Sequence, residues 1–114
     1  DDAPEIVRKM VAADVIVLAT PVYFYTMSAQ MKTLIDRCCA GYLEIRDKEF
    51  YFIVAAAETS VAAMERTIDG FRGFLDCLDN PQEKGVVYCV GAWHKGDIQG
   101  KQAMKQAYEM GRNI

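Results

Sequence analysis

Three aromatic side chains follow one another in the stretch Thr20–Met27, directly after a run of apolar residues. They are Tyr23, Phe24 and Tyr25. A surface loop gains nothing in folding from three large rings, whereas such rings pack well on a planar ligand or on a partner subunit. Ser28 is a typical residue to begin a helix, whose free N–H groups and positive dipole end favour electron-rich ligands. The stretch therefore predicts a site for a flat heterocycle with polar edges, and a subunit interface built by the same rings stays open.

Other reactive side chains have less specific surroundings. His94 follows Trp93 in an expected loop, and its titration near neutral pH suits proton transfer, but we interpret it as an exposed or structural histidine. Trp93 either covers a ligand or packs at a subunit contact. Thr59 or Ser60 is interpreted as a helix cap rather than a nucleophile, because no histidine or lysine base is close in sequence. We therefore name no catalytic side chain.

The four cysteines, at positions 38, 39, 77 and 89, show no CxxC spacing. The pattern gives neither the disulfide framework of a small secreted protein nor a set of zinc ligands, so no metal is expected. Free thiols are typical of a reducing cytoplasm, which is the expected location. Cys38 and Cys39 end an expected helix, where the dipole does not favour a thiolate, and both are interpreted as packing residues.

The composition excludes several classes of partner. A chain of 114 residues is enough for one domain or part of one, and 52% apolar with 25% charged residues is typical of a globular protein. The formal charge of −3 gives no basic surface for nucleic acid. No apolar run approaches the ~18 residues of a membrane span, and no secretory signal pattern occurs. Neither nucleic acid nor membrane is therefore expected as a partner.

Two hydrophobic periodicities alternate along the chain. Continuous apolar runs predict strands buried on both faces of a parallel sheet, and apolar positions at helical spacing predict helices between them. Asp2 is expected to cap the first helix, Pro21 to end the first strand and Gly41 to end the second helix. The expected elements are helix 2–13, strand 15–20, helix 28–41, strand 50–57, helix 60–80, strand 86–92 and a last helix over 103–111. The residues of the last helix expected to face inward are Ala103, Met104, Ala107, Tyr108 and Gly111.

This order of elements predicts the place of a ligand. Strands that are separated by helices imply right-handed crossovers and a parallel sheet with helices on its faces. Ligands of such sheets lie beyond the carboxyl ends of the strands. The rule indicates three loops, 21–27, 57–60 and 92–98.

The segment Ala13–Arg37 resembles the central segment of the NADPH-dependent FMN reductase family, which are flavodoxin-like flavoproteins that include quinone reductases and iron–sulfur flavoproteins. The family pattern is a strand ending in Ser/Thr-Pro-Val/Ile-Tyr, a short loop, Ser, and a helix carrying Lys and Asp-Arg. The residues in these places are Thr20, Pro21, Val22, Tyr23, Ser28, Lys32, Asp36 and Arg37. The resemblance implies an α/β fold, a flavodoxin-like three-layer α/β/α arrangement with a parallel sheet.

The resemblance also implies a set of cofactor contacts. In the family, the loop after this strand lies along the isoalloxazine ring and ribityl chain of FMN, and the next loop borders the polar edge of the ring. From the residues alone, Glu58 is interpreted as solvated or capping. The segment Ala55–Ala57 stands where family members often carry glycines. Carried over to this sequence, the cofactor-binding residues are Pro21, Val22, Tyr23, Phe24, Thr26, Glu58 and Thr59.

The activity implied is that of an FMN-dependent NAD(P)H oxidoreductase, in a homodimer or homotetramer, which passes hydride from NAD(P)H to FMN and then to a quinone or other acceptor. An electron carrier or FMN-binding module without NAD(P)H activity stays open, as does a fragment without bound cofactor. No phosphate loop of the type Gly-Ser-x-Arg-x-x-Gly-Asn-Thr occurs. We therefore expect residues 1–114 to be a single, partial flavodoxin-like domain that supplies strands 3, 4 and 5, with strand 15–20 at an exposed edge.

Overall fold

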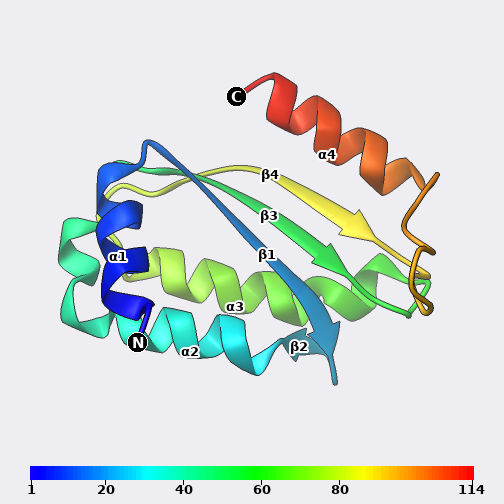
Figure 1. Cartoon of the computed structure of the whole chain (residues 1–114), viewed down its shortest axis with the longest axis horizontal. Coiled ribbons are helices and arrows are strands. Elements are labelled where there is room, and N and C mark those ends of the chain that lie inside the picture. Colours follow the sequence, from blue (N-terminus) through cyan, green and yellow to red (C-terminus); the bar gives the residue numbers. More distant parts are fainter.

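The computed structural model describes residues 1–114 as four helices around one four-stranded sheet (Figure 1). Short 3₁₀ turns at Cys38–Ala40, Tyr42–Glu44 and Val61–Met64 complete the regular structure. The helices and strands in chain order are α1 (Ala3–Ala12), β1 (Val15–Tyr23), β2 (Thr26–Met27), α2 (Ala29–Arg37), β3 (Glu49–Ala55), α3 (Glu65–Asp76), β4 (Gln82–Cys89) and α4 (Gln102–Arg112).

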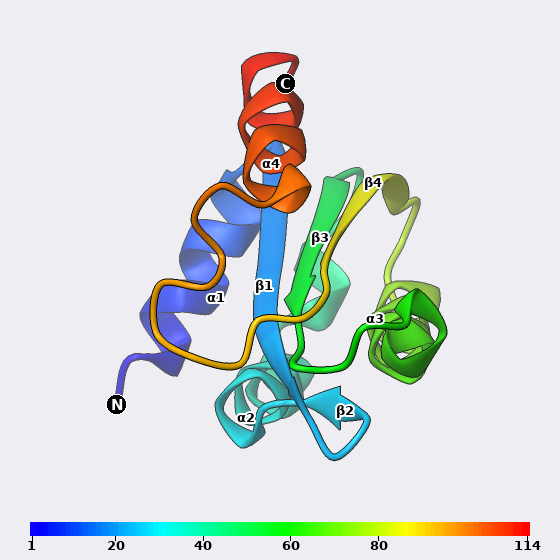
Figure 2. The same cartoon turned by 90° about the vertical axis from the view of Figure 1, so that its right-hand side faces the viewer.

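The sheet has the strand order β2-β1-β3-β4. β1, β3 and β4 are parallel neighbours, as the alternation of strands and helices predicts, and β2 is a two-residue antiparallel addition to the end of β1. Helices α2 and α3 lie on one face of the sheet and α4 on the other, so that the molecule has three layers (Figures 1 and 2). The predicted α/β class and layering are therefore confirmed.

The main core fills the space between the sheet and the layer of α2 and α3. Its centre is a stacked pair, Phe52 of β3 and Phe71 of α3, with ring centroids 4.9 Å apart. A smaller cluster lies under α4, where Ala103 packs against Val87 and Cys89 of β4. Five apolar residues at helical spacing within the segment 60–80, which the sequence predicts to be a helix, are all buried: Met64, Ile68, Phe71, Leu75 and Leu78.

The prediction that the first strand is buried on both faces is wrong. Ile16 and Leu18 point into the core, but Val17 is 45% exposed and Ala19 is also exposed. The physical reason is that α4 packs against β4 and leaves this face of β1 uncovered. Along Val15–Pro21 the outer edge of β1 pairs with no strand, so the expected exposed edge is present.

Several boundaries differ from their predictions. β1 continues through Pro21 to Tyr23, because an edge strand tolerates a residue without an N–H donor. Asp2 makes no side-chain cap to α1; instead Asp1 Oδ1 accepts a hydrogen bond from the N–H of Ala3 at 3.0 Å. α2 ends at Arg37 and passes into 3₁₀ turns. α3 begins after a 3₁₀ turn, and β4 begins four residues earlier than predicted, at position 82, and ends at 89.

The predicted inward face of the last helix is only partly correct. Ala103 is buried and Ala107 is half-buried against the small cluster, whereas Met104, Tyr108 and Gly111 are exposed. Met110 packs against the cluster in their place. Likewise Cys38 is buried as predicted, while Cys39 is exposed.

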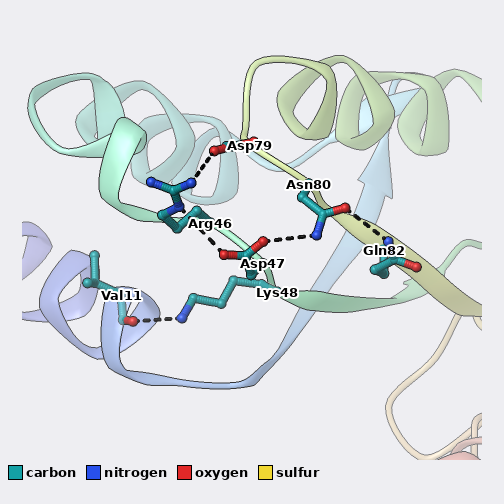
Figure 3. Close-up of polar contacts among 7 residues, drawn as sticks. All are labelled: Val11, Arg46, Asp47, Lys48, Asp79, Asn80 and Gln82. Carbon is teal, nitrogen blue, oxygen red and sulfur yellow. Dashed lines mark hydrogen bonds and ion pairs between the residues drawn. The ribbon is translucent and has the colours of Figure 1, made fainter.

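A network of polar side chains ties the amino ends of the strands together (Figure 3). Arg46 Nη2 lies 2.7 Å from Asp79 Oδ2, and Asp47 Oδ1 accepts a hydrogen bond from Asn80 Nδ2 at 2.9 Å. Lys48 Nζ donates to the carbonyl oxygen of Val11 at 2.8 Å. These contacts join the segments that lead into β3 and β4 to the end of α1. No helix of the structure has the length and apolar character needed to cross a membrane.

Candidate functional site

The three segments that follow β1, β3 and β4 meet at the carboxyl ends of the parallel strands, the side that faces the viewer in Figure 2. They enclose a cleft of about 400 Å³, within the usual ~300–1,000 Å³ of small-molecule sites. All its lining residues are apolar or aromatic, so it offers a surface for an apolar ligand. The lining residues are Pro21, Val22, Tyr23, Phe24, Ala55, Ala56, Ala57, Ala92 and Trp93.

The segment after the first strand is a β-hairpin where a loop was predicted. Val22 pairs with Met27 and Tyr23 with Thr26, which leaves only Phe24 and Tyr25 in the turn. Both turn residues have positive φ, 49° and 68°. A two-residue hairpin turn of this kind prefers Asn-Gly, and the left-handed conformation costs other residues roughly 1–2 kcal/mol each. The turn is therefore strained, which is a common property of functional sites.

A pair of buried hydroxyl groups closes the base of this hairpin. Thr20 Oγ1 accepts a hydrogen bond from the backbone N–H of Ser28 at 3.0 Å and donates to the carbonyl oxygen of Pro21 at 2.8 Å. Ser28 Oγ accepts from the N–H of Met31 at 3.3 Å, so the predicted cap of the second helix is confirmed. Thr20 and Ser28 are 5% and 7% exposed. The hairpin is thus fixed at its base to both β1 and α2.

The three consecutive aromatic residues have different surroundings. Tyr23 and Phe24 line the cleft, and Phe24, at the tip, is 100% exposed. Tyr25 is absent from the cleft lining, and its ring lies under the guanidinium of Arg66, 5.2 Å from the carbon Cζ to the ring centroid. The hairpin therefore presents two rings to the cleft and one to α3.

The second loop contributes its alanines rather than the polar residues predicted from sequence. Ala57 lines the cleft, whereas Glu58 and Thr59 do not. Glu58 Oε1 accepts a hydrogen bond from the N–H of Thr59 at 2.9 Å, and the carbonyl oxygen of Glu58 accepts from the N–H of Gly91 at 2.9 Å. Glu58 thus caps its own loop and joins it to the third loop.

Thr26 also lies outside the cleft lining. It pairs with Tyr23 in β2 and faces a separate hollow between α2 and α3, which Met27 and Phe74 also line. Of the residues predicted as cofactor contacts, the structure therefore brings together Pro21, Val22, Tyr23 and Phe24.

The third loop supplies the wall opposite the hairpin. Trp93 lines the cleft and is 75% exposed. Asp97 Oδ2 accepts hydrogen bonds from the N–H groups of Trp93 at 3.1 Å and His94 at 2.7 Å, which fixes the loop backbone. His94 is exposed and does not line the cleft, consistent with its interpretation as a non-catalytic residue.

The residues predicted as cofactor contacts did not include the alanines, and Trp93 was predicted either to cover a ligand or to pack at a subunit contact. Ala55, Ala56, Ala57 and Ala92 carry no functional group that would single them out. The signal that could have found them is position alone, because each lies at or just beyond the carboxyl end of a strand.

The lining fits the isoalloxazine ring of FMN, the cofactor that the resemblance implies. Aromatic and methyl groups suit the faces of a flat ring, and the backbone N–H groups of Phe24 and Ala57 are not hydrogen-bonded within the protein, so they are free for polar edge atoms. No lining residue carries a charge. These residues therefore suit the ring of the cofactor and provide no basic group for its phosphate.

Comparison with protein families and curated relatives gives a consistent result. The family model of NADPH-dependent FMN reductase matches residues 1–87. The chain is 33% identical to an FMN-dependent NADH:quinone oxidoreductase of Thiobacillus denitrificans, over 92% of this chain and 55% of that protein. It is 57% identical over 37 residues to an iron-sulfur flavoprotein of Methanocaldococcus jannaschii, which covers 32% of this chain and 19% of that one. The chain thus spans about half of the quinone oxidoreductase and less of the iron-sulfur flavoprotein.

Solved structures support the fold. The Trp repressor binding protein from Bacillus subtilis matches with a TM-score of 0.82 at 23% identity, over 93% of this chain and 73% of that one. An azoreductase from Bacillus anthracis matches with a TM-score of 0.67 at 19% identity, over 98% and 62%. At such identities the similarity concerns the fold, which is the predicted flavodoxin-like α/β fold.

Proposed function

The chain belongs to the NADPH-dependent FMN reductase family, and on that basis we propose that it forms the flavin-ring site of an FMN-dependent NAD(P)H oxidoreductase. The observation that carries the proposal is the apolar cleft at the carboxyl ends of β1, β3 and β4. A parallel sheet places its ligands there, and the aromatic hairpin and Trp93 supply the flat surfaces that a ring requires.

The residues of the cleft have separate tasks in this proposal. Pro21 and Val22 support one side of the ring, and Tyr23 and Phe24 cover it from the hairpin. Ala55–Ala57 keep the bottom of the cleft shallow because their side chains are single methyl groups. Trp93 closes the opposite wall and reduces the access of water. Glu58 and Thr59 act through the loop backbone that they fix.

FMN supplies the redox chemistry when bound, by accepting a hydride from NAD(P)H and passing electrons to an acceptor. The protein contributes binding, orientation and exclusion of solvent. An acceptor of the quinone type is supported by the function of the T. denitrificans relative. No acid or base is assigned, because no titratable side chain other than Tyr23 lines the cleft.

The proposal extends to the assembly and its location. We propose that residues 1–114 are part of a flavodoxin-like domain that works as a homodimer or homotetramer in the cytoplasm. The exposed rings of Tyr23, Phe24 and Trp93 support a subunit contact near the cleft, since aromatic residues are enriched in interfaces. The four unpaired cysteines support a reducing compartment.

Trp93 makes a direct binding test possible, because it is the single tryptophan of the chain and lines the cleft. We expect titration with FMN to quench its fluorescence and the flavin fluorescence together. Because the lining has no charged group, riboflavin should bind to this chain about as well as FMN. Ala57→Phe, which fills the cleft, should abolish both signals, while Ala12→Phe at the exposed end of α1 should not.

Addition of NADPH or NADH to the FMN-loaded protein without oxygen tests the activity. Bleaching of the flavin absorption followed by reoxidation with a quinone supports the reductase. Bound flavin that stays oxidised would assign an electron carrier or an FMN-binding module instead. Failure of both flavins to bind would remove the proposal.

A further inference from the structure

The two turn residues of the hairpin raise the question of what keeps them in place. Phe24 and Tyr25 have φ values of 49° and 68°. Glycine or asparagine adopts such values at low cost, but neither residue type is present in this turn. The ring of Phe24 is fully exposed and contributes no packing that would fix the tip. A conformation that these residues adopt poorly persists only when neighbouring groups determine it.

The base of the hairpin is held on two sides. Ser28 donates its N–H to Thr20 Oγ1, and the buried side chain of Met27 lies against α3. A Cβ added to Gly70 of α3 would lie only 2.9 Å from Met27 Cε, so the absence of a side chain at Gly70 makes room for it. These contacts fix residues 27 and 28 but do not reach the turn itself.

The tip has one specific partner, the guanidinium of Arg66 at the start of α3. It lies 5.2 Å from the centroid of the Tyr25 ring, within the ~6 Å range of a cation–π contact. Arg66 forms no ion pair, in contrast to Arg72 of the same helix, whose Nε is 2.8 Å from Glu83 Oε1. The neighbouring Glu65 is engaged elsewhere, since its Oε1 accepts a hydrogen bond from the hydroxyl of Tyr88 at 2.8 Å.

We propose that Arg66 is a positioning residue for the flavin site: by holding the Tyr25 ring against α3, it keeps the strained turn in the conformation that places Tyr23 and Phe24 at the cleft. The effect of Arg66 on FMN binding rests on the proposed function. Its effect on the hairpin of the ligand-free protein rests on the hairpin geometry alone. Arg66 itself is outside the cleft lining. Its contribution is to reduce the conformational freedom that binding must otherwise remove.

The test uses the whole chain and two independent readouts. Arg66→Met removes the charge and keeps an unbranched side chain, Arg66→Lys keeps a cation over the ring, and Tyr25→Leu removes the ring from the other side. The matched control is Arg8→Met, which replaces an exposed arginine of α1 that forms no ion pair. In Figure 1, α1 and the hairpin lie at different ends of the molecule. The readouts are hydrogen exchange of the amides of residues 23–27 in ligand-free protein, and the dissociation constant for FMN.

We expect Arg66→Met and Tyr25→Leu each to speed hairpin exchange and to weaken FMN binding by about two- to fivefold, the equivalent of one exposed cation–π contact. Combining the two should add little, since both remove the same contact. Arg66→Lys should restore most of the protection. Hairpin exchange in Arg66→Met equal to that in Arg8→Met would overturn the proposal. If the unmodified protein binds no FMN, the proposed function fails, while the exchange comparison still decides the role of Arg66.

Discussion

Thr20 and Ser28 are eight residues apart in sequence, yet Thr20 Oγ1 accepts a hydrogen bond from the backbone N–H of Ser28 at 3.0 Å. Both residues are almost fully buried. This one hydrogen bond joins the point where the hairpin leaves the sheet to the point where it enters α2. The whole segment Pro21–Met27 is therefore a closed unit, fixed at its base and strained at its tip.

Thr20→Val tests this closure. Valine has nearly the same shape but no acceptor, so the buried N–H of Ser28 loses its partner, at a cost of roughly 1–3 kcal/mol of unfolding free energy. Chemical denaturation measures the change, and Thr33→Val on the exposed side of α2 serves as the control. Equal unfolding midpoints for the two variants would mean that the hydroxyl of Thr20 does not hold the hairpin.

Phe24→Asn separates stability from binding. Asparagine tolerates positive φ, so the variant should gain up to about 1 kcal/mol of stability, with no loss of packing because the Phe24 ring is fully exposed. Phe24→Val should lose stability, since a branched side chain resists this conformation. Both variants should bind FMN more weakly than the unmodified chain. A stabilising Phe24→Val would show that the turn is not strained.

Two glycines of α3 allow a matched comparison. Glycine to alanine inside a helix typically gains about 0.5–1 kcal/mol. A Cβ at Gly73 would meet nothing within 4 Å, so Gly73→Ala should show this gain in denaturant unfolding. A Cβ at Gly70 would displace Met27, so Gly70→Ala should gain clearly less. A larger gain from Gly70→Ala would mean that Met27 moves freely and does not anchor the hairpin.

Tyr88 gives the stability a defined dependence on pH. Burial, together with the hydrogen bond to Glu65, raises the pKa of Tyr88 to about 12 from its ordinary value of 10.0. Its protonated form is favoured in the folded state, so the contribution is complete below pH 10 and is lost as the pH rises from there towards 12. Denaturant unfolding at intervals above pH 9 should show the decline. Tyr88→Phe should remove most of this decline, whereas Tyr108→Phe, at an exposed position of α4, should not. The same dependence of unfolding free energy on pH in both variants would contradict the raised pKa of Tyr88.

The sequence predicted those features that depend on local pattern or on general rules of α/β sheets. The apolar spacing of Ile68, Phe71 and Leu75 identifies the buried side of α3, and Ser28 has the residue type of a helix cap. The meeting of three loops at one end of the sheet follows from the order of strands and helices alone. Each of these results needs only neighbours in sequence or the topology.

The hairpin and the exposed faces could not be predicted in this way. Phe24 and Tyr25 are unusual turn residues, so nothing in their types indicates a two-residue turn. The contacts beside the turn, Thr20 with Ser28 and Tyr25 with Arg66, do not follow from the residue types either. Met104 and Tyr108 follow a helical spacing but face solvent, because α4 packs Ala103, Ala107 and Met110 against the cluster on β4. The spacing of residues shows which positions of a helix are apolar, but not how much of the sheet that helix covers.

The network of Arg46, Asp79, Asp47 and Asn80 (Figure 3) lies at the amino ends of the strands. The hairpin lies at the opposite end of the sheet (Figure 1), and Trp93 lines the same cleft as the hairpin. Substitutions at such distances combine additively in stability. Substitutions that alter ligand binding at the carboxyl ends of the strands should therefore leave the contribution of this network to the free energy of unfolding unchanged. Ligand binding and the free energy of unfolding can thus be changed separately, by substitutions at opposite ends of the same sheet.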